Sequence, residues 1–383
     1  MKHINLVVFI LLISLSCTDQ ESEGVSEGFL VSDDFQSYSL DKGTPKVRFS
    51  QVIESIELVR LEETSNSLLS NFYGIEANTN HLVFTSGKEL DVFVFSQNGD
   101  FGRKINRKGS GPEEYEDITD LWLAGDTLFI HSRDQKKVVR YDLEGNFIEA
   151  DRLPNSTGHI YSYKRGYAME MSYYPINDTS FYRYAVFNQQ LEPVAMYLPV
   201  EKLIPKGLDF SNNSISTYKE GLLFHRMMND TVYYLRDEKF TPLVHFDFGE
   251  YWYWKEAREV NSDLMRLIQA SEDIWSATML MDDKYIWVFP VVGIGKKNAS
   301  FLIERVTGLV RYVDMQKSSE GDYLGNALGW DNGKMIFIAQ STDLAELLSE
   351  LSEDQINFRQ GTTLEEIESS ENPVLMWVKF NDF

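Results

Sequence analysis

The residues best suited to ligand chemistry stand around one glycine-containing loop. They are Arg107, Glu113, Glu114 and Tyr115, joined further along the chain by Ser132, Arg133 and Asp134. Arginine and carboxylates form bidentate hydrogen bonds and aromatic rings stack on flat groups, so this set suits a hydroxyl-rich or peptide ligand. The sequence therefore predicts a ligand-binding site here. The structural alternative is that Gly109, Gly111 and Pro112 serve backbone needs and that the loop side chains only hold the loop.

The sequence patterns that would indicate catalysis are weaker than those that indicate ligand binding. The histidines are His3, His81, His131, His159, His225 and His245, and none is spaced i,i+3 or i,i+4 from another as a zinc site on a helix would be. The sequence lacks a nucleophile elbow, a phosphate-binding loop, a calcium loop and a dinucleotide fingerprint. We therefore predict no catalytic residue, no metal and no cofactor. A binding or interaction module is favoured over an enzyme, with a glycan-active hydrolase or a lyase as the alternative, because a carboxylate pair can hydrolyse glycosides at a suitable separation.

Short apolar runs follow the loop and would position these side chains. The runs cover residues 115–124, 127–131, 138–142 and 146–153. Turn residues separate them at Gly125-Asp126 and at Glu144-Gly145-Asn146. Runs of this length with such boundaries predict a four-stranded antiparallel meander.

The meander is one of several comparable units. Five complete units can be placed at residues 72–107, 115–153, 158–199, 212–249 and 273–314. A sixth, formed from residues 325–340 and 373–380, lacks one strand, and the run 55–61 (SIELVRL) belongs to no unit. Pairing that run with 373–380 would close a ring and remove two open edges. The sequence therefore predicts an all-β, six-bladed β-propeller of four-stranded antiparallel blades, closed by its N-terminal strand.

Helical insertions are expected at residues 251–271, 342–351 and 363–369, the second opening with Thr342 as its cap. In a propeller, the connection from strand four to the next blade and the connection from strand two to strand three lie on the same face. Strand parity therefore places these insertions and the glycine loop on one face. Loops on a rigid scaffold often carry binding groups, so this is the expected working face.

The loop sequence KGSGPEEY, residues 108–115, resembles the GxGPxEY signature of six-bladed β-propeller lipoproteins of Bacteroidetes, which are related in shape to NHL-repeat propellers. The resemblance extends over the chain after its N-terminal segment and includes NPVL at residues 372–375. It implies the propeller fold and a place in the cell envelope.

The N-terminus reads as an export signal. Residues 1–17 combine a basic start, an apolar run and a lipobox-like end at Cys17, the sole cysteine. We expect Cys17 to be acylated and to hold the protein on the bilayer of the outer membrane or cell envelope, facing the periplasm or the surface. An ordinary signal peptide is the alternative. Residues 18–46 are polar and acidic and are expected to form a flexible tether, which leaves 47–383 for the propeller.

The formal net charge of the chain is −23. Nucleic acid and anionic lipid surfaces both need a basic footprint, so the charge argues against either as a partner. The simplest role of this acidity is to keep an exported protein soluble. Attraction of cationic ligands is the alternative.

Overall fold

The computed structural model describes residues 34–70, 72–86, 90–171, 181–200, 214–255, 268–269, 271–293, 299–316 and 327–382. The predicted signal peptide with Cys17 lies outside the described residues. So do the first part of the tether and most of the helix expected at 251–271.

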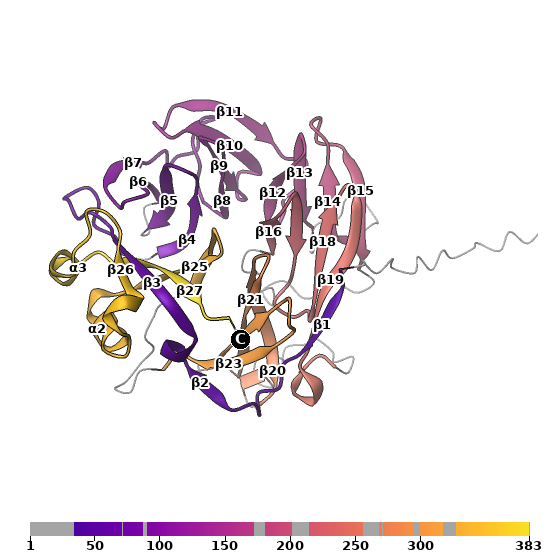
Figure 1. Ribbon diagram of the computed structural model, residues 1–383. Helices are drawn as coiled ribbons and strands as arrows, with labels where there is room; N and C mark the ends of the chain where they lie inside the picture. The colour runs from indigo at the N-terminus through magenta and orange to yellow at the C-terminus, as the bar shows by residue number, and fades with distance from the viewer. Residues whose placement is uncertain are drawn as a thin grey trace, which may run out of the picture.

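Six small sheets stand in a ring, which confirms the predicted six-bladed β-propeller (Figure 1). We number the blades from the first complete sheet. Blade 1 contains β4 (Phe72–Ala77), β5 (His81–Ser86), β6 (Asp91–Ser96) and β7 (Phe101–Ile105). Blade 2 contains β8 (Asp120–Ala124), β9 (Thr127–Ser132), β10 (Lys137–Asp142) and β11 (Phe147–Arg152). Blade 3 contains β12 (Ile160–Tyr163), β13 (Gly166–Glu170), β14 (Tyr182–Phe187) and β15 (Pro193–Pro199).

The other three blades each carry a fifth strand. Blade 4 contains β16 (Ile215–Tyr218), β17 (Gly221–Phe224), β18 (Thr231–Arg236), β19 (Lys239–Asp247) and β1 (Gln36–Ser39). Blade 5 contains β20 (Ile274–Met281), β21 (Tyr285–Val292), β22 (Ser300–Glu304), β23 (Val310–Asp314) and β2 (Lys46–Arg48). Blade 6 contains β24 (Ala327–Asp331), β25 (Lys334–Ala339), β27 (Val374–Phe380), β3 (Ile53–Arg60) and β26 (Ile356–Phe358).

The N-terminal segment runs around the outside of two blades. β1 pairs in parallel with β19, and β2 pairs in parallel with β23. Tyr38 and Leu40 are buried against the apolar face of blade 4. The prediction of a flexible tether up to residue 46 is therefore wrong for its last part, because these apolar side chains and the free edge of β19 offset the ordering entropy of the segment.

Ring closure follows the prediction. β3 pairs antiparallel with β27, from Arg60 opposite Val374 to Ile53 opposite Phe380. The buried side chain of Asn372, just before β27, fixes the chain leaving β3. It accepts from the Leu69 amide at 2.8 Å and donates to the Ser67 carbonyl at 2.9 Å. The last blade thus combines β3, from the N-terminal part of the chain, with β27 near its C-terminus, and loss of β3 would leave β27 with an exposed strand edge.

Apolar side chains fill the spaces between blades. Trp287 of blade 5 and Met376 of blade 6 belong to one buried cluster, and Trp377 faces blade 1 in another. This alternation along β27 places successive side chains on opposite faces of the sheet, as a strand requires. Each blade therefore contributes to two interfaces and is held from both sides.

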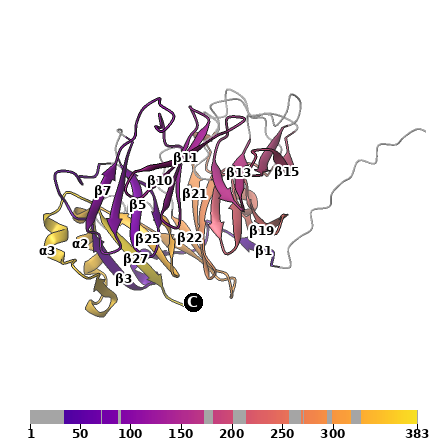
Figure 2. The same ribbon diagram turned by 90° about the horizontal axis from the view of Figure 1, so that it is seen from above.

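The predicted helices after strand two of blade 6 are present. α2 (Ser341–Ser349) begins after Gln340, so Thr342 is not its cap as expected. α3 (Leu364–Ser369) begins after Thr363, whose hydroxyl accepts from the Glu366 amide as a normal N-cap. Figures 1 and 2 place both helices at one side of the ring and β1 at the other. Within the described residues, no helix is long and apolar enough to cross a membrane.

Candidate functional site

Polar side chains gather at one mouth of the ring. The first strand of each blade begins at this mouth and the second strand ends there, which is the face predicted from strand parity. In blades 2 to 4, this position holds buried groups that can ionise or donate hydrogen bonds, and they are His131, His159, Glu170, Ser214, His225 and Arg226. The blade interfaces below them are apolar, so the polar set is confined to the mouth.

Asp120, the first residue of β8, lies at the centre of the set. Its carboxylate is 2.8 Å from Nδ1 of His131 in the same blade and 2.6 Å from Nδ1 of His159 in blade 3. The Ile160 amide donates to it at 3.1 Å. Burial alone would raise the pKa of Asp120, but the charge of His159 and the two imidazole hydrogen bonds outweigh burial and hold the pKa at about 2. Asp120 is therefore a carboxylate at all physiological pH values, and it joins blades 2 and 3.

Glu170, at the end of β13, repeats this arrangement one blade further on. Its carboxylate is 3.1 Å from Nε of Arg226 in blade 4 and accepts from the Ser214 hydroxyl at 2.7 Å. Both charged side chains are almost fully buried. A buried pair of this kind adds little net stability compared with apolar packing, although removal of one partner is costly. Stability alone thus gives little reason for its presence.

His225 stays neutral in this environment. Burial lowers its pKa to about 4, because the charged imidazole would lose its hydration. Its Nε2 lies 2.9 Å from the Asn229 carbonyl, which fixes Nε2 as the protonated nitrogen. In contrast, Nε2 of His131 is buried without a hydrogen-bond partner among the described residues. The mouth thus contains one imidazole whose ring nitrogen is satisfied by a backbone carbonyl and one whose buried Nε2 has no partner among the described residues.

The glycine loop lies on the same face but further from the axis, over the seam between blades 1 and 2. Tyr115 is fully buried, and its hydroxyl donates to the Leu90 carbonyl at 3.0 Å. Arg107 donates to the Gly145 carbonyl, with Nη2 at 2.8 Å. Glu114 folds back and accepts from the Gly111 amide at 2.8 Å. A Cβ on Gly109 would stand 2.0 Å from this carboxylate, so a larger residue there would require the Glu114 side chain to move.

The remaining predicted site residues form two groups, one buried and one exposed. The Ser132 hydroxyl is buried and donates to Asp117 at 2.7 Å. Asp117 also accepts from the Arg133 and Asp134 amides, so it holds the turn between β9 and β10. Residues 115–119, predicted as the start of a strand, are shaped by these contacts, and β8 begins only at Asp120. The side chains of Glu113, Arg133 and Asp134 remain exposed on the predicted face.

Sequence reasoning missed the residues at the mouth because it judged each histidine alone. A signal was present in the aligned second strands DTLFIHS, GYAMEMS and GLLFHRM, each of which ends an apolar run with a group that can ionise. These positions correspond to His131, Glu170 and His225. Among the described residues, no group of three or more His, Cys, Asp or Glu side chains is arranged to hold a metal ion.

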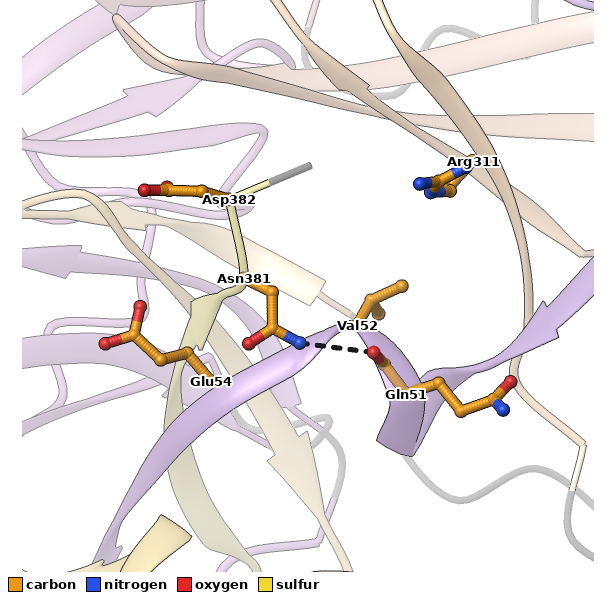
Figure 3. Close-up of a pocket in the computed structure, with 6 residues that line it drawn as sticks. All are labelled: Gln51, Val52, Glu54, Arg311, Asn381 and Asp382. Carbon is orange, nitrogen blue, oxygen red and sulfur yellow. Dashed lines mark hydrogen bonds between the residues drawn. The ribbon is translucent and has the colours of Figure 1, made fainter.

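A cavity of about 460 Å³ lies at the other face, where β3 begins and β27 ends (Figure 3). It is lined by Gln51, Val52, Glu54, Arg311, Asn381 and Asp382. Arg311 and Asp382 stand on opposite sides of it, above Val52 and Asn381. Lys379 lies 2.6 Å from Glu54, and Lys284 pairs with Asp382. The carboxylates of this cavity are therefore already neutralised, and the mouth around Asp120 is the stronger candidate.

Comparison with known proteins agrees with the fold. The model of the DUF4934 family, a domain of unknown function, matches residues 36–379. The chain belongs to this family. No curated protein matches the sequence. The match begins at the first residue of β1, so the family domain includes the N-terminal strands that run around blades 4 and 5.

Two solved structures resemble this DUF4934 protein. One is a Bacteroides fragilis protein whose description infers export, with 17% identity, a TM-score of 0.74, and coverage of 91% of this chain and 100% of that one. The other is a member of the DUF4221 family from Bacteroides vulgatus, with 11% identity, a TM-score of 0.51, and coverage of 86% and 97%. At these identities the likeness establishes the fold alone. Together with the family match, it supports the predicted kinship with propellers of Bacteroidetes.

Proposed function

We propose that this DUF4934 protein is an exported, lipid-anchored binding module that takes a glycan or peptide ligand at the mouth formed by blades 2 to 4. The observation that carries the proposal is the run of buried polar groups from Asp120 through His159 to Glu170 and Arg226. These groups join neighbouring blades, but apolar side chains would do so at lower desolvation cost. Binding of a polar ligand accounts for them better than packing does.

The chemistry of the mouth fits a ligand rich in hydroxyl or amide groups. Imidazoles, a guanidinium and carboxylates offer both donors and acceptors, and a rigid ring of blades holds them in place. The exposed side chains of Glu113, Arg133 and Asp134 add a polar rim on the same face. We therefore retain these three predicted residues as rim contacts of the proposed site. Arg107, Glu114, Tyr115 and Ser132 would support the rim from below.

A glycan and peptide binding screen tests this proposal on a soluble chain that starts at Asp34. For a ligand found in the screen, Arg133→Ala and His159→Ala should each weaken affinity roughly ten- to a hundredfold, since each removes a charge-assisted hydrogen bond of about 1.5 to 3 kcal/mol. Arg165→Ala is the matched control, because Arg165 is exposed in the turn between β12 and β13 on the opposite face. Binding that both mouth variants leave intact would place the ligand elsewhere and end the proposal.

Catalysis on the same scaffold is a second candidate, favoured by one observation. A carboxylate that fixes the orientation of an imidazole is a common general-base arrangement, and Asp120 with His159 has that form. A hydrolase or lyase would convert ligands from the screen, and His159→Ala would abolish product formation while binding persists. Ligands recovered unchanged after long incubation with the parent protein would favour the binding module.

Export and anchoring rest on Cys17 and on the description of the Bacteroides fragilis neighbour as exported. We expect Cys17→Ala, expressed in a Bacteroidetes host, to move the protein from the membrane fraction to the soluble fraction. Acyl chains hold a protein through their buried methylene groups, so their loss removes the anchor. Cys17→Ala protein that stays with the membrane would show that something other than the lipid holds it.

A further inference from the structure

The outer strand of blade 3, β15, has a free edge. It is the last strand of its sheet, and no further strand pairs with it among the described residues. The Val200 amide donates to the Phe181 carbonyl at 3.0 Å. Since hydrogen-bonded and non-hydrogen-bonded positions alternate along an antiparallel pair, the N–H and C=O of Tyr197, three residues earlier, point away from β14. The edge of β15 can therefore form hydrogen bonds with an added strand.

This edge lacks the protection that free edges usually have. β7 and β11, the outer strands of blades 1 and 2, expose charged side chains such as Lys104 and Glu149, which discourage pairing with another strand. β15 contains no charged residue, and its Val194 and Met196 are 60% and 42% exposed. Its composition is therefore that of an edge strand that another segment covers.

Half-buried aromatic rings lie beside the same edge. Tyr197 stacks on Phe240 of blade 4 with ring centres 4.4 Å apart, and Phe240 stacks on Tyr233 at 5.0 Å. All three rings keep partial exposure. They pack against the apolar interface of blades 3 and 4, so an apolar segment along β15 would bury them further and gain the free energy of that burial.

The chain itself covers the outer strands of the next two blades. β1 lies on blade 4 and β2 on blade 5, each in parallel with the strand that it covers. Tyr38 and Leu40 are buried between blades 4 and 5. Val47 and Phe49, nine residues later, pack between blades 5 and 6. The N-terminal segment thus advances from blade to blade, with one apolar pair spaced i,i+2 for each blade.

We propose that residues 27–31 (EGFLV) dock on blade 3 as a fifth strand, parallel to β15. Phe29 and Val31 repeat the i,i+2 apolar pair nine residues before that of the segment on blade 4. They share one face of the strand and cover the rings between blades 3 and 4, while its backbone pairs with the edge at Tyr197. Because the spacing is again nine residues, the connection to β1 is as long as the connection from β1 to β2. Figure 1 shows β15 on the same side of the ring as β1, in the preceding blade.

The docked strand sets the distance between the propeller and its anchor. It leaves residues 18–26 to span from Cys17 to blade 3. With Cys17 acylated as proposed above, a span of this length keeps the outer edge of blade 3 within roughly 35 Å of the bilayer. The docking itself needs neither the lipid nor a ligand at the mouth, so each proposal can fail alone.

Amide hydrogen exchange tests the docking in a soluble chain that starts at Thr18. We expect the Tyr197 amide to exchange about tenfold or more slowly in this chain than in the chain from Asp34, because only the longer chain can pair with it. An edge strand opens locally, so the two chains melt alike and exchange is the measurement that separates them. Phe29→Asp should restore fast exchange. Ser22→Asp, which adds the same charge outside the docked residues, should not.

Spin labels locate the segment and separate it from other occupants of the edge. The chain from Thr18 contains no cysteine, so labels on Gly28→Cys and Val194→Cys report one pair of positions. We expect a single narrow distance distribution that persists when unlabelled protein is added in excess. A broad distribution, or equal exchange of Tyr197 in the chains from Thr18 and Asp34, would overturn the proposal. A narrow distance that excess unlabelled protein removes would assign the edge to a second copy of the chain and would overturn it as well.

Discussion

Asp120→Asn is expected to lower the free energy of unfolding by about 3 to 5 kcal/mol, measured by urea denaturation at pH 7. The reason is the position of the carboxylate, which accepts from both His131 and His159 and from the Ile160 amide. An asparagine at this position has an NH₂ group in place of one carboxylate oxygen. This donor would face the imidazole donors and could not accept from them. The loss should therefore exceed that of an ordinary hydrogen bond, and blades 2 and 3 should separate more easily.

The same group predicts a pH dependence. The folded pKa of Asp120 is held at about 2, below the unfolded value of 3.8, so the folded state binds its proton less tightly. The stabilisation is then complete above about pH 4 and disappears as pH falls toward 2, by about 2 kcal/mol. In Asp120→Asn, the stability curve should be flatter over this window.

Asp134→Asn is the matched control for these measurements. Asp134 is exposed in the neighbouring turn, and it is its backbone amide that contacts Asp117. Its substitution should change stability by no more than about 0.5 kcal/mol. If Asp120→Asn behaved like this control, the two imidazoles would have found other partners, and the carboxylate would not be what joins the blades.

Removal of β3 should abolish cooperative folding. A chain that begins at Glu62 lacks the strand that pairs with β27 along its whole length, and it loses Ile56 and Leu58 from the core of blade 6. β27 and β26 would both be left as unpaired edges. We expect a broad thermal transition without a sharp heat-absorption peak, together with aggregation.

Two longer chains separate the roles of the N-terminal strands. A chain from Asp34 should melt like the full protein. A chain from Ser50 loses β1 and β2 but keeps β3, so blades 4 and 5 retain four strands each and the ring stays closed. It should melt sharply at a lower temperature. A chain from Glu62 with the same sharp transition as the chain from Ser50 would show that the ring closes without β3.

Two residues of the predicted site that turn inward show where sequence reasoning reaches its limit. Tyr115 and Glu114 stand in a motif that suggests recognition, yet Tyr115 packs against Tyr141 with ring centres 6.2 Å apart, and Glu114 satisfies its own loop. The residue types around a loop determine which hydrogen bonds its side chains can form. Whether those side chains face solvent or the protein interior depends on the packing of two blades against each other.

The sequence by itself determined the ring, its closure and the face that carries the insertions. These features depend on local patterns, namely the alternation of apolar residues in runs such as 55–61, the turns between them, and the count of strands. Tertiary structure alone decided the rest. Asp120 and His159 are 39 residues apart in different blades, Glu76 and Leu123 are 47 apart, and β1 pairs with a strand about 200 residues later. A polar side chain acquires its role from the partner that faces it across a blade interface, and no local pattern specifies that partner.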